Sequence, residues 1–165
     1  MDDIEQQAKL RDYAFKVLSF RPRSCHEIKQ KLDAYCAKKK FPENLAEKVI
    51  ADLLEKNFLN DEEFALWWKE QRSGQKAKGY RLIKIELQQK GIPSEIIEKV
   101  LMQDQKSQEQ ELASALALVN KKSRLFAHLP KNEAEVKIAN FLMRRGFNWS
   151  IISKVIDSVG EKAYN

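Results

Sequence analysis

Apolar residues recur at helical spacing along almost the whole chain. Residues 4–20 carry an apolar stripe with i, i+4 spacing, which predicts a helix with one buried face. The stripe consists of Ile4, Ala8, Tyr13, Ala14, Val17 and Leu18. Similar stripes follow in the later segments, and none alternates with a period of two for long enough to form a strand. The pattern therefore predicts an all-α protein of nine helices.

Capping signals indicate where several of these helices begin and end. Pro22 breaks the first helix, because a proline disfavours the α conformation of the residue before it. Ser24 and Glu27 have the spacing of a capping box, in which each side chain satisfies a free backbone N–H at a helix start. Asn60 or Asp61 can cap the fourth helix in the same manner.

The helical pattern is repeated within the chain. Residues 87–101 and 142–156 match at an offset of 55, and a third copy lies upstream at an offset of 51. Gly91 and Gly146 occupy one slot of the repeat, where each is predicted to end a helix in the left-handed conformation. Lys40 takes this slot in the first copy, and the four additional residues there predict a different turn.

This repetition predicts three modules of three helices each. They are expected at residues 1–59, 60–105 and 106–165. A single module cannot bury its apolar face alone, so we expect the modules to stack into an elongated, curved molecule. Such a molecule usually offers an extended surface to its partners.

Charge alternates in sign along the repeats. The net charge is +6 at neutral pH. Residues 13–40 hold eight Lys or Arg against two acids, residues 41–66 two against seven, and residues 69–90 seven against two. The second helices of the modules, with their approaches, are therefore basic, and stacking should bring them onto one face. A basic stripe of this kind suits a polyanionic filament or an acidic groove.

We expect this basic face to bind the partner or DNA. Its candidate residues are Arg21, Arg23, Arg72, Lys76, Lys78, Arg81 and Lys84. Trp67 is a further candidate contact. It lies about 100° around its helix from Trp68, so that only one of the two rings can point fully into the core, and Trp68 is expected to be buried. A solvated face with pairs such as Lys29–Asp33 is the alternative interpretation.

No combination of residues indicates catalysis or metal binding. Cys25 and His26 are adjacent at a helix start, which does not provide the geometry of a nucleophile and its base. These two residues, Cys36 and His128 lack the spacing of metal ligands. The acids at residues 61–63 suit a helix N-terminus. We therefore expect a protein that is not an enzyme and that binds no cofactor and no metal. The two cysteines are expected to be reduced thiols.

Three motifs resemble those of the RecX family of bacterial recombination regulators, in order and along the whole chain. They read Arg21-Pro22-Arg23-Ser24-x-x-Glu27-x-x-x-Lys31-Leu32, then Leu59-Asn60-Asp61-Glu62-x-Phe64-Ala65-x-x-Trp68, then Lys78-Gly79-x-x-x-Ile83-x-x-Glu86-Leu87-x-x-Lys90-Gly91-Ile92. Asn57 departs from the glycine that family members often have, but asparagine also tolerates a left-handed turn. The third module is the most divergent outside its Gly146 region.

The resemblance implies three tandem three-helix repeats and a regulator of the RecA recombinase. Such a regulator binds the RecA–DNA filament and limits its extension, strand exchange, ATP turnover and the co-protease activity that triggers the SOS response. A helical protein that binds DNA phosphates directly, and a passive helical scaffold, are the alternatives. We expect a cytoplasmic protein, since no apolar run approaches the roughly 18 residues of a membrane span and the N-terminus is acidic. We also expect it to be a monomer.

Overall fold

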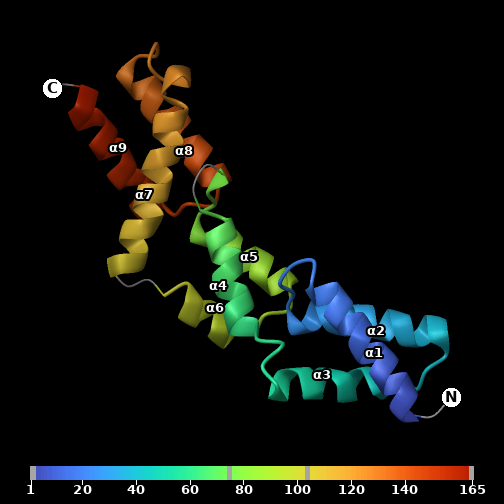
Figure 1. Ribbon diagram of the computed structural model, residues 1–165. Coiled ribbons are helices and arrows are strands. Elements are labelled where there is room, and N and C mark those ends of the chain that lie inside the picture. Colours follow the sequence, from blue (N-terminus) through green and yellow to red (C-terminus); the bar gives the residue numbers. More distant parts are fainter. Residues whose placement is uncertain (1–2, 74–75, 103–104, 164–165) are drawn as a thin grey trace. The chain divides into compact units, whose positions relative to one another are not determined.

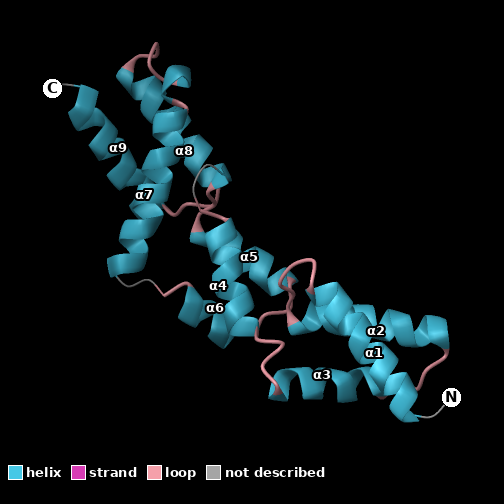
Figure 2. Cartoon of the chain, viewed as in Figure 1, coloured by secondary structure: helices cyan, strands magenta, loops and turns pink. Residues whose placement is uncertain are grey.

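The computed structural model describes residues 3–73, 76–102 and 105–163, and all regular structure in these ranges is helical (Figures 1 and 2). Nine α-helices are described, with one short 3-10 helix. They are α1 (Asp3–Leu18), α2 (Cys25–Lys39), α3 (Leu45–Glu55), α4 (Asp61–Gln71), α5 (Tyr80–Gln89), α6 (Ser94–Val100), α7 (Gln105–Lys121), the 3-10 helix (Ser123–Leu125), α8 (Lys131–Arg144) and α9 (Trp149–Ala163). The all-α prediction is confirmed. None of these helices is long and apolar enough to cross a bilayer.

Several predicted boundaries are confirmed. Ser24 caps α2: its side chain accepts the N–H of Glu27 at 3.1 Å, while the Glu27 carboxylate accepts the N–H of Ser24 at 3.3 Å. Asn60, of the two candidates, caps α4, because its side-chain oxygen accepts the N–H groups of Glu62 and Glu63 at 3.0 and 3.1 Å. The carboxylate of Asp61 is therefore not needed as the cap and can accept a hydrogen bond from another helix.

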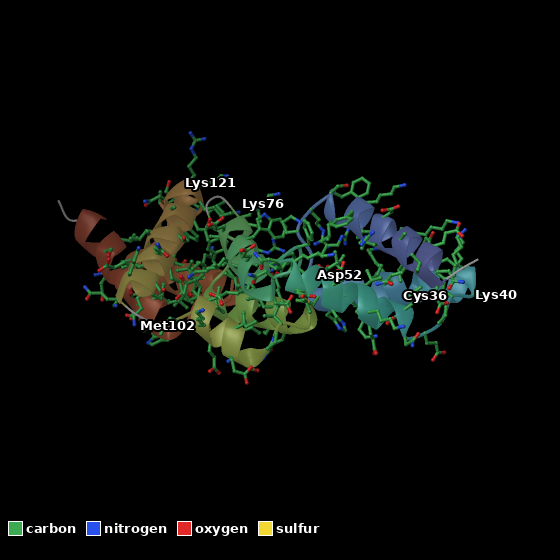
Figure 3. The ribbon with its side chains drawn as sticks, turned by 60° about the horizontal axis from the view of Figure 1, so that its bottom comes forward. Cys36, Lys40, Asp52, Lys76, Met102 and Lys121 are labelled. Atoms are coloured by element: carbon green, nitrogen blue, oxygen red, sulfur yellow. The ribbon has the colours of Figure 1, made fainter. Side chains whose placement is uncertain are left out.

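Left-handed residues stand where the repeat predicts them. Gly91 and Gly146 have φ angles of 73° and 85°, and Asn57 has a φ of 56°. The prediction of a different turn at Lys40 was wrong, because Lys40 ends α2 with a left-handed φ of 56° (its place is labelled in Figure 3).

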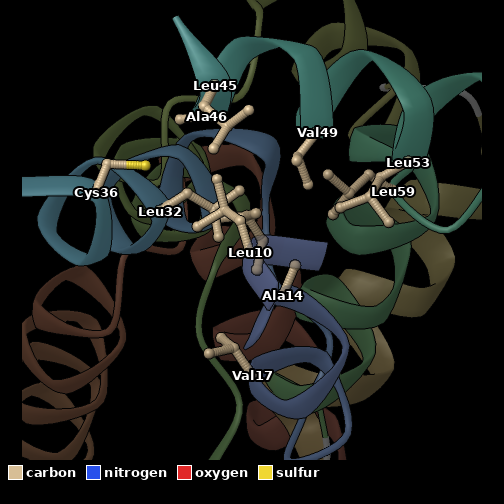
Figure 4. Close-up of a cluster of buried hydrophobic side chains, with 11 residues drawn as sticks. Leu10, Ala14, Val17, Leu32, Cys36, Leu45, Ala46, Val49, Leu53 and Leu59 are labelled. Carbon is tan, nitrogen blue, oxygen red and sulfur yellow. The ribbon is translucent and has the colours of Figure 1, made fainter. Parts of the chain in front are cut away.

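The described chain divides into two compact units, each of which is described by itself. The first consists of Met1–Trp67 with Leu87–Ile97, and the second of Trp68–Glu86 with Glu98–Asn165. Figure 4 shows the core of the first unit, where apolar side chains of α1, α2 and α3 converge. Among them, Leu10, Leu32 and Leu53 are fully buried. Burial of each such side chain stabilises the fold by about 1.5–3 kcal/mol.

The second unit has its core between α7, α8 and α9. Its largest buried side chains include Leu118, Leu142, Phe147 and Ile151, and Ala77 packs against the same cluster. Val100 and Leu101, at the end of the second repeat, are also buried in this unit. Ile97, which belongs to the first unit, is buried there, and Ile96 is half-buried.

Successive modules are joined by hydrogen bonds of the same design, which we call the first and second joints. In the first joint, within the first unit, the Ser24 hydroxyl donates to the carbonyl of Lys90 at 2.7 Å, and the N–H of Cys25 donates to the Asp61 carboxylate at 2.8 Å. The start of α2 thereby meets the end of α5 and the start of α4.

The second joint repeats this design within the second unit. The N–H of Gly79 donates to the carbonyl of Arg145 at 2.8 Å, and the N–H of Tyr80 donates to the buried Glu111 carboxylate at 2.9 Å. Gly79 and Arg145 follow Ser24 and Lys90 by 55 residues each. The sequence repeat thus corresponds to a repeated contact between modules.

Candidate interaction surface

Arg21 lies just before α2 and belongs to an ion cluster around Glu27. The Arg21 guanidinium and the Lys90 ammonium each approach the Glu27 carboxylate at 2.8 Å. Burial raises the pKa of Glu27, but the bonds from Arg21, Lys90 and the Ser24 N–H outweigh it and lower the pKa to about 2. Two cations therefore share the carboxylate of Glu27.

Arg23, the other candidate of the first unit, is half-buried. Its guanidinium donates to the carbonyl of Val17 at 3.2 Å. This bond satisfies one of the carbonyls at the C-terminal end of α1 that have no partner within the helix. Arg23 also lines a groove between α1 and α2. Arg23 therefore stabilises the end of α1 and also lines a concave surface.

Arg72 and Lys78 lie together in the second unit, around the carboxylate of Glu86. The Arg72 Nε donates to Glu86 at 2.8 Å, Lys78 pairs with the other carboxylate oxygen, and the Trp68 indole N–H donates at 2.8 Å. The Arg72 guanidinium also stacks over the Trp68 ring, 4.1 Å from its centroid. Burial raises the pKa of Glu86, but these hydrogen bonds outweigh it and the net shift is downward.

The remaining candidates of the second unit are exposed. Lys76 lies before α5, where Figure 3 labels it, and Lys84 lies on α5. Neither makes an ion pair with any residue of the described ranges. Arg81, also on α5, donates to the carbonyl of Met143 at 3.3 Å with its side chain exposed. Lys76, Arg81 and Lys84 thus present charge to solvent at the start of α5.

Both tryptophans of α4 are half-buried. The prediction that Trp68 is buried was therefore wrong: its indole N–H needs a polar partner, and Glu86 provides one at the edge of the core. The Trp67 ring packs against Phe64 with centroids 5.8 Å apart. Trp67 therefore keeps part of its surface accessible, as a contact residue requires.

Cys25 and His26, the side chains considered for catalysis, have surroundings that do not activate them for catalysis. Burial raises the pKa of the Cys25 thiol to about 12, with Asp61 adding to the effect, so the thiol stays protonated at neutral pH and is a poor nucleophile. His26 is exposed and bonds Gln30 at 3.0 Å. Among the described residues, no three His, Cys, Asp or Glu side chains converge as metal ligands.

Sequence reasoning missed three features of this surface. It did not identify Glu86 as the centre of an ion cluster, or Lys90 as a partner of Glu27. It also counted the lysines of α1 and α2 only as part of a basic segment and did not predict that they line one groove. Arg72 and Glu86 are 14 residues apart on different helices, and Glu27 and Lys90 are 63 apart. Local spacing carries no signal for such pairs, although both glutamates occur in the motifs quoted above.

Three sequence models of one family match the chain in order. They describe the first, second and third three-helix domains of RecX, and they match residues 11–53, 60–101 and 108–156. Together they cover most of the described helices.

Curated relatives and solved structures give the same result. The chain is 32% identical to a protein named Regulatory protein RecX from Corynebacterium efficiens, over 87% of this chain and 68% of that protein. It is 28% identical to another of that name from Mycolicibacterium smegmatis, over 92% and 79%. The crystal structure of RecX from Lactobacillus salivarius superposes with a TM-score of 0.82 at 23% identity, covering 95% of this chain and 98% of that one. At this identity the likeness concerns the fold.

Proposed function

This chain belongs to the RecX family of regulatory proteins, and from that premise we propose that it regulates the RecA recombinase. In this proposal the protein binds the RecA–DNA filament through its basic residues. It thereby inhibits filament extension, strand exchange, ATP hydrolysis and co-protease activity, and so restrains DNA repair and the SOS response. It acts by binding, in the cytoplasm, without a chemical step of its own.

The observation that carries the proposal is the exposed positive charge at the start of α5. Lys76 and Lys84 pair with no carboxylate in the described ranges, and Arg81 keeps its side chain exposed. Exposed, unneutralised cations are available to a polyanionic partner. Arg72 and Lys78 both pair with Glu86, and together they carry one more charge than this carboxylate neutralises.

Arg21 and Arg23 make up the corresponding set in the first unit. Arg21 pairs with Glu27, and Arg23 bonds the carbonyl of Val17. We propose that the two sets contact neighbouring protomers of the filament, and that Trp67 adds an aromatic contact. Binding across protomers would block addition of further subunits or hold the filament in one conformation.

ATP hydrolysis by purified recombinase on single-stranded DNA, titrated with this protein, tests the proposal. Wild-type protein should lower the rate of hydrolysis. The triple variant Lys76→Glu, Arg81→Glu, Lys84→Glu should lose this inhibition while its far-UV circular dichroism stays unchanged. A matched control, Lys48→Glu, Lys106→Glu, Lys154→Glu, makes the same change of net charge at exposed lysines elsewhere. Normal inhibition by the first variant would remove the basic face from the proposal.

Direct binding to DNA phosphates is the second candidate, favoured by the same unpaired lysines. In that case the affinity for bare DNA should fall linearly on a log–log plot against salt, by roughly one unit of slope for each phosphate contacted. A filament regulator should instead bind the recombinase–DNA complex far more tightly than DNA alone. Fluorescence anisotropy with labelled DNA, with and without recombinase, separates the two candidates.

A further inference from the structure

An open groove of about 1130 Å³ lies between α1 and α2, in the first unit. Six of the residues that line it are Lys or Arg, and two are acids. The cations are Lys9, Lys16, Arg23, Lys31, Lys38 and Lys39. Apart from Arg23, none of them belongs to the basic face proposed to bind the filament.

Most of the groove's positive charge is not neutralised from within. Lys16, Lys31 and Lys38 make no ion pair with any residue in the described part of the chain. Glu27, one of the two acids, already holds Arg21 and Lys90. The groove therefore has a surplus of positive charge at a concave surface, where a ligand loses less of its interaction energy to water.

Two tyrosines contribute an apolar centre to the groove. The rings of Tyr13 and Tyr35 stack with centroids 4.4 Å apart and an angle of 26°. Lys39 lies 6.0 Å from the centroid of the Tyr35 ring, and Ala34 also lines the groove. A ligand of this groove should therefore combine negative charge with small apolar groups.

The lysines stand in two rows. Lys31 and Lys38 are seven residues apart on α2. On α1, Lys16 follows Lys9 by seven residues, and Lys9 already pairs with Glu5 at 2.9 Å. Seven residues of helix span about 10 Å. Three residues of a chain in the polyproline II conformation span about 9 Å, and its period of three returns every third side chain to the same face. Tyr13 lies between Lys9 and Lys16 on α1, and Tyr35 lies between Lys31 and Lys38 on α2. Because the two rings stack, they separate one pair of lysines on each helix. Carboxylates about 10 Å apart would match this spacing.

We propose that this groove binds an acidic segment of a partner polypeptide, in which acidic residues are separated by small neutral ones. Three observations favour a polypeptide over a nucleic acid. The ring faces of Tyr13 and Tyr35 that meet in the stack cannot hold bases. Asp12 lines the groove without an ion-pair partner among the described residues, and it repels a chain charged at every unit. Lysines, which suit separated point charges, outnumber arginine, whose fork suits phosphate.

Fluorescence anisotropy with two probes on the full chain tests this proposal. The first probe is a fluorescein-labelled peptide that repeats one glutamate and two alanines, and the second is a labelled oligothymidylate of equal net charge. We expect the peptide to bind the wild-type protein more tightly than the oligothymidylate at equal ionic strength. The recombinase is absent, so the result does not depend on the function proposed above.

Variants of the groove complete the test. Lys16→Glu with Lys31→Glu should weaken peptide binding about tenfold or more, and the milder Lys16→Gln with Lys31→Gln should weaken it in the same direction. The control Lys48→Glu with Lys154→Glu changes the net charge equally and should bind as the wild type does. Asp12→Asn should strengthen oligothymidylate binding more than peptide binding. The proposal is overturned by tighter binding of the oligothymidylate, by no peptide binding, or by equal losses in the groove and control variants.

Discussion

The carboxylate of Glu111 in α7 accepts the backbone N–H of Tyr80, the first residue of α5, at 2.9 Å. Asp61 in α4 accepts the N–H of Cys25, the first residue of α2, at 2.8 Å. In both joints an acid from the first helix of one module satisfies a free N–H at the second helix of the module before it. The two acids therefore connect modules as well as cap helices.

Glu111→Ala should destabilise the protein by about 1–3 kcal/mol, because a buried N–H of α5 loses its acceptor. The residue is 3% exposed, so water cannot replace the carboxylate without rearrangement. Urea unfolding followed by circular dichroism measures the change. Glu109→Ala, on the exposed face of the same helix, is the control and should change stability by about 0.5 kcal/mol or less. Equal effects of the two variants would contradict a capping role for Glu111.

Glu111→Gln should behave differently and reveal a pH dependence. Burial raises the pKa of Glu111 above its ordinary value of 4.5, with the Tyr80 N–H and Lys69 only partly opposing this. When the pKa of an acid is higher in the folded state than in the unfolded state, the acid stabilises the protein at pH values below its unfolded-state pKa. This contribution is lost as the pH rises through the folded-state pKa. Gln keeps an acceptor and has no proton to lose. The stability of the wild type relative to this variant should therefore fall as pH rises above 4.5, and a constant difference would contradict the assignment.

Glu27 should show the opposite dependence. Its pKa is lowered from 4.5 to about 2, so its contribution is present above pH 4.5 and is lost as pH falls toward 2. Glu27→Gln should cost about 1–3 kcal/mol at neutral pH, because Arg21 and Lys90 lose their shared partner. The cost should shrink in acid. Urea unfolding between pH 7 and 2 measures it, with Glu47→Gln on the exposed face of α3 as the control.

Gly79→Ala should disrupt the second joint. A Cβ at this position would clash with the backbone carbonyl of Gly146, and backbone atoms there cannot move aside cheaply. We expect a loss of more than about 2 kcal/mol, as for other overpacked sites. Gly160→Ala in α9 is the control, since nothing lies within 4 Å of its Cβ, and it should stabilise the helix by up to about 1 kcal/mol. Thermal unfolding of both variants decides, and a Gly79→Ala protein as stable as the wild type would contradict the close approach.

Variants of Arg72 and Lys76 should distinguish residues of the basic face that stabilise the fold from residues that only bind the partner. Arg72→Gln loses an ion pair with Glu86 and a stack on Trp68, and should cost about 1 kcal/mol or more of stability. Lys76→Gln should leave stability within about 0.5 kcal/mol, because this exposed lysine pairs with no carboxylate in the described ranges. Urea unfolding beside the recombinase assay compares them. A destabilised Lys76→Gln protein would show that Lys76 has a structural role.

The sequence by itself determined the helices, their caps and the repeat. The period of the apolar residues predicted all-α structure, the Ser24–Glu27 capping box is present, and Gly91 and Gly146 are left-handed as their slot requires. These features depend on residues within one or two helical turns of each other, so their signal is local. The family resemblance, too, rested on such short motifs.

The tertiary structure alone decided which charges are free. Arg21, Arg72 and Lys78 looked equivalent to Lys76 and Lys84 in sequence, yet the first three hold Glu27 or Glu86 and the last two face solvent. It also decided that Trp68 stays at the core's edge and that lysines of α1 and α2 line one groove. The physical reason is that an ion pair or a groove depends on distance in space between helices, which no periodicity along the chain encodes.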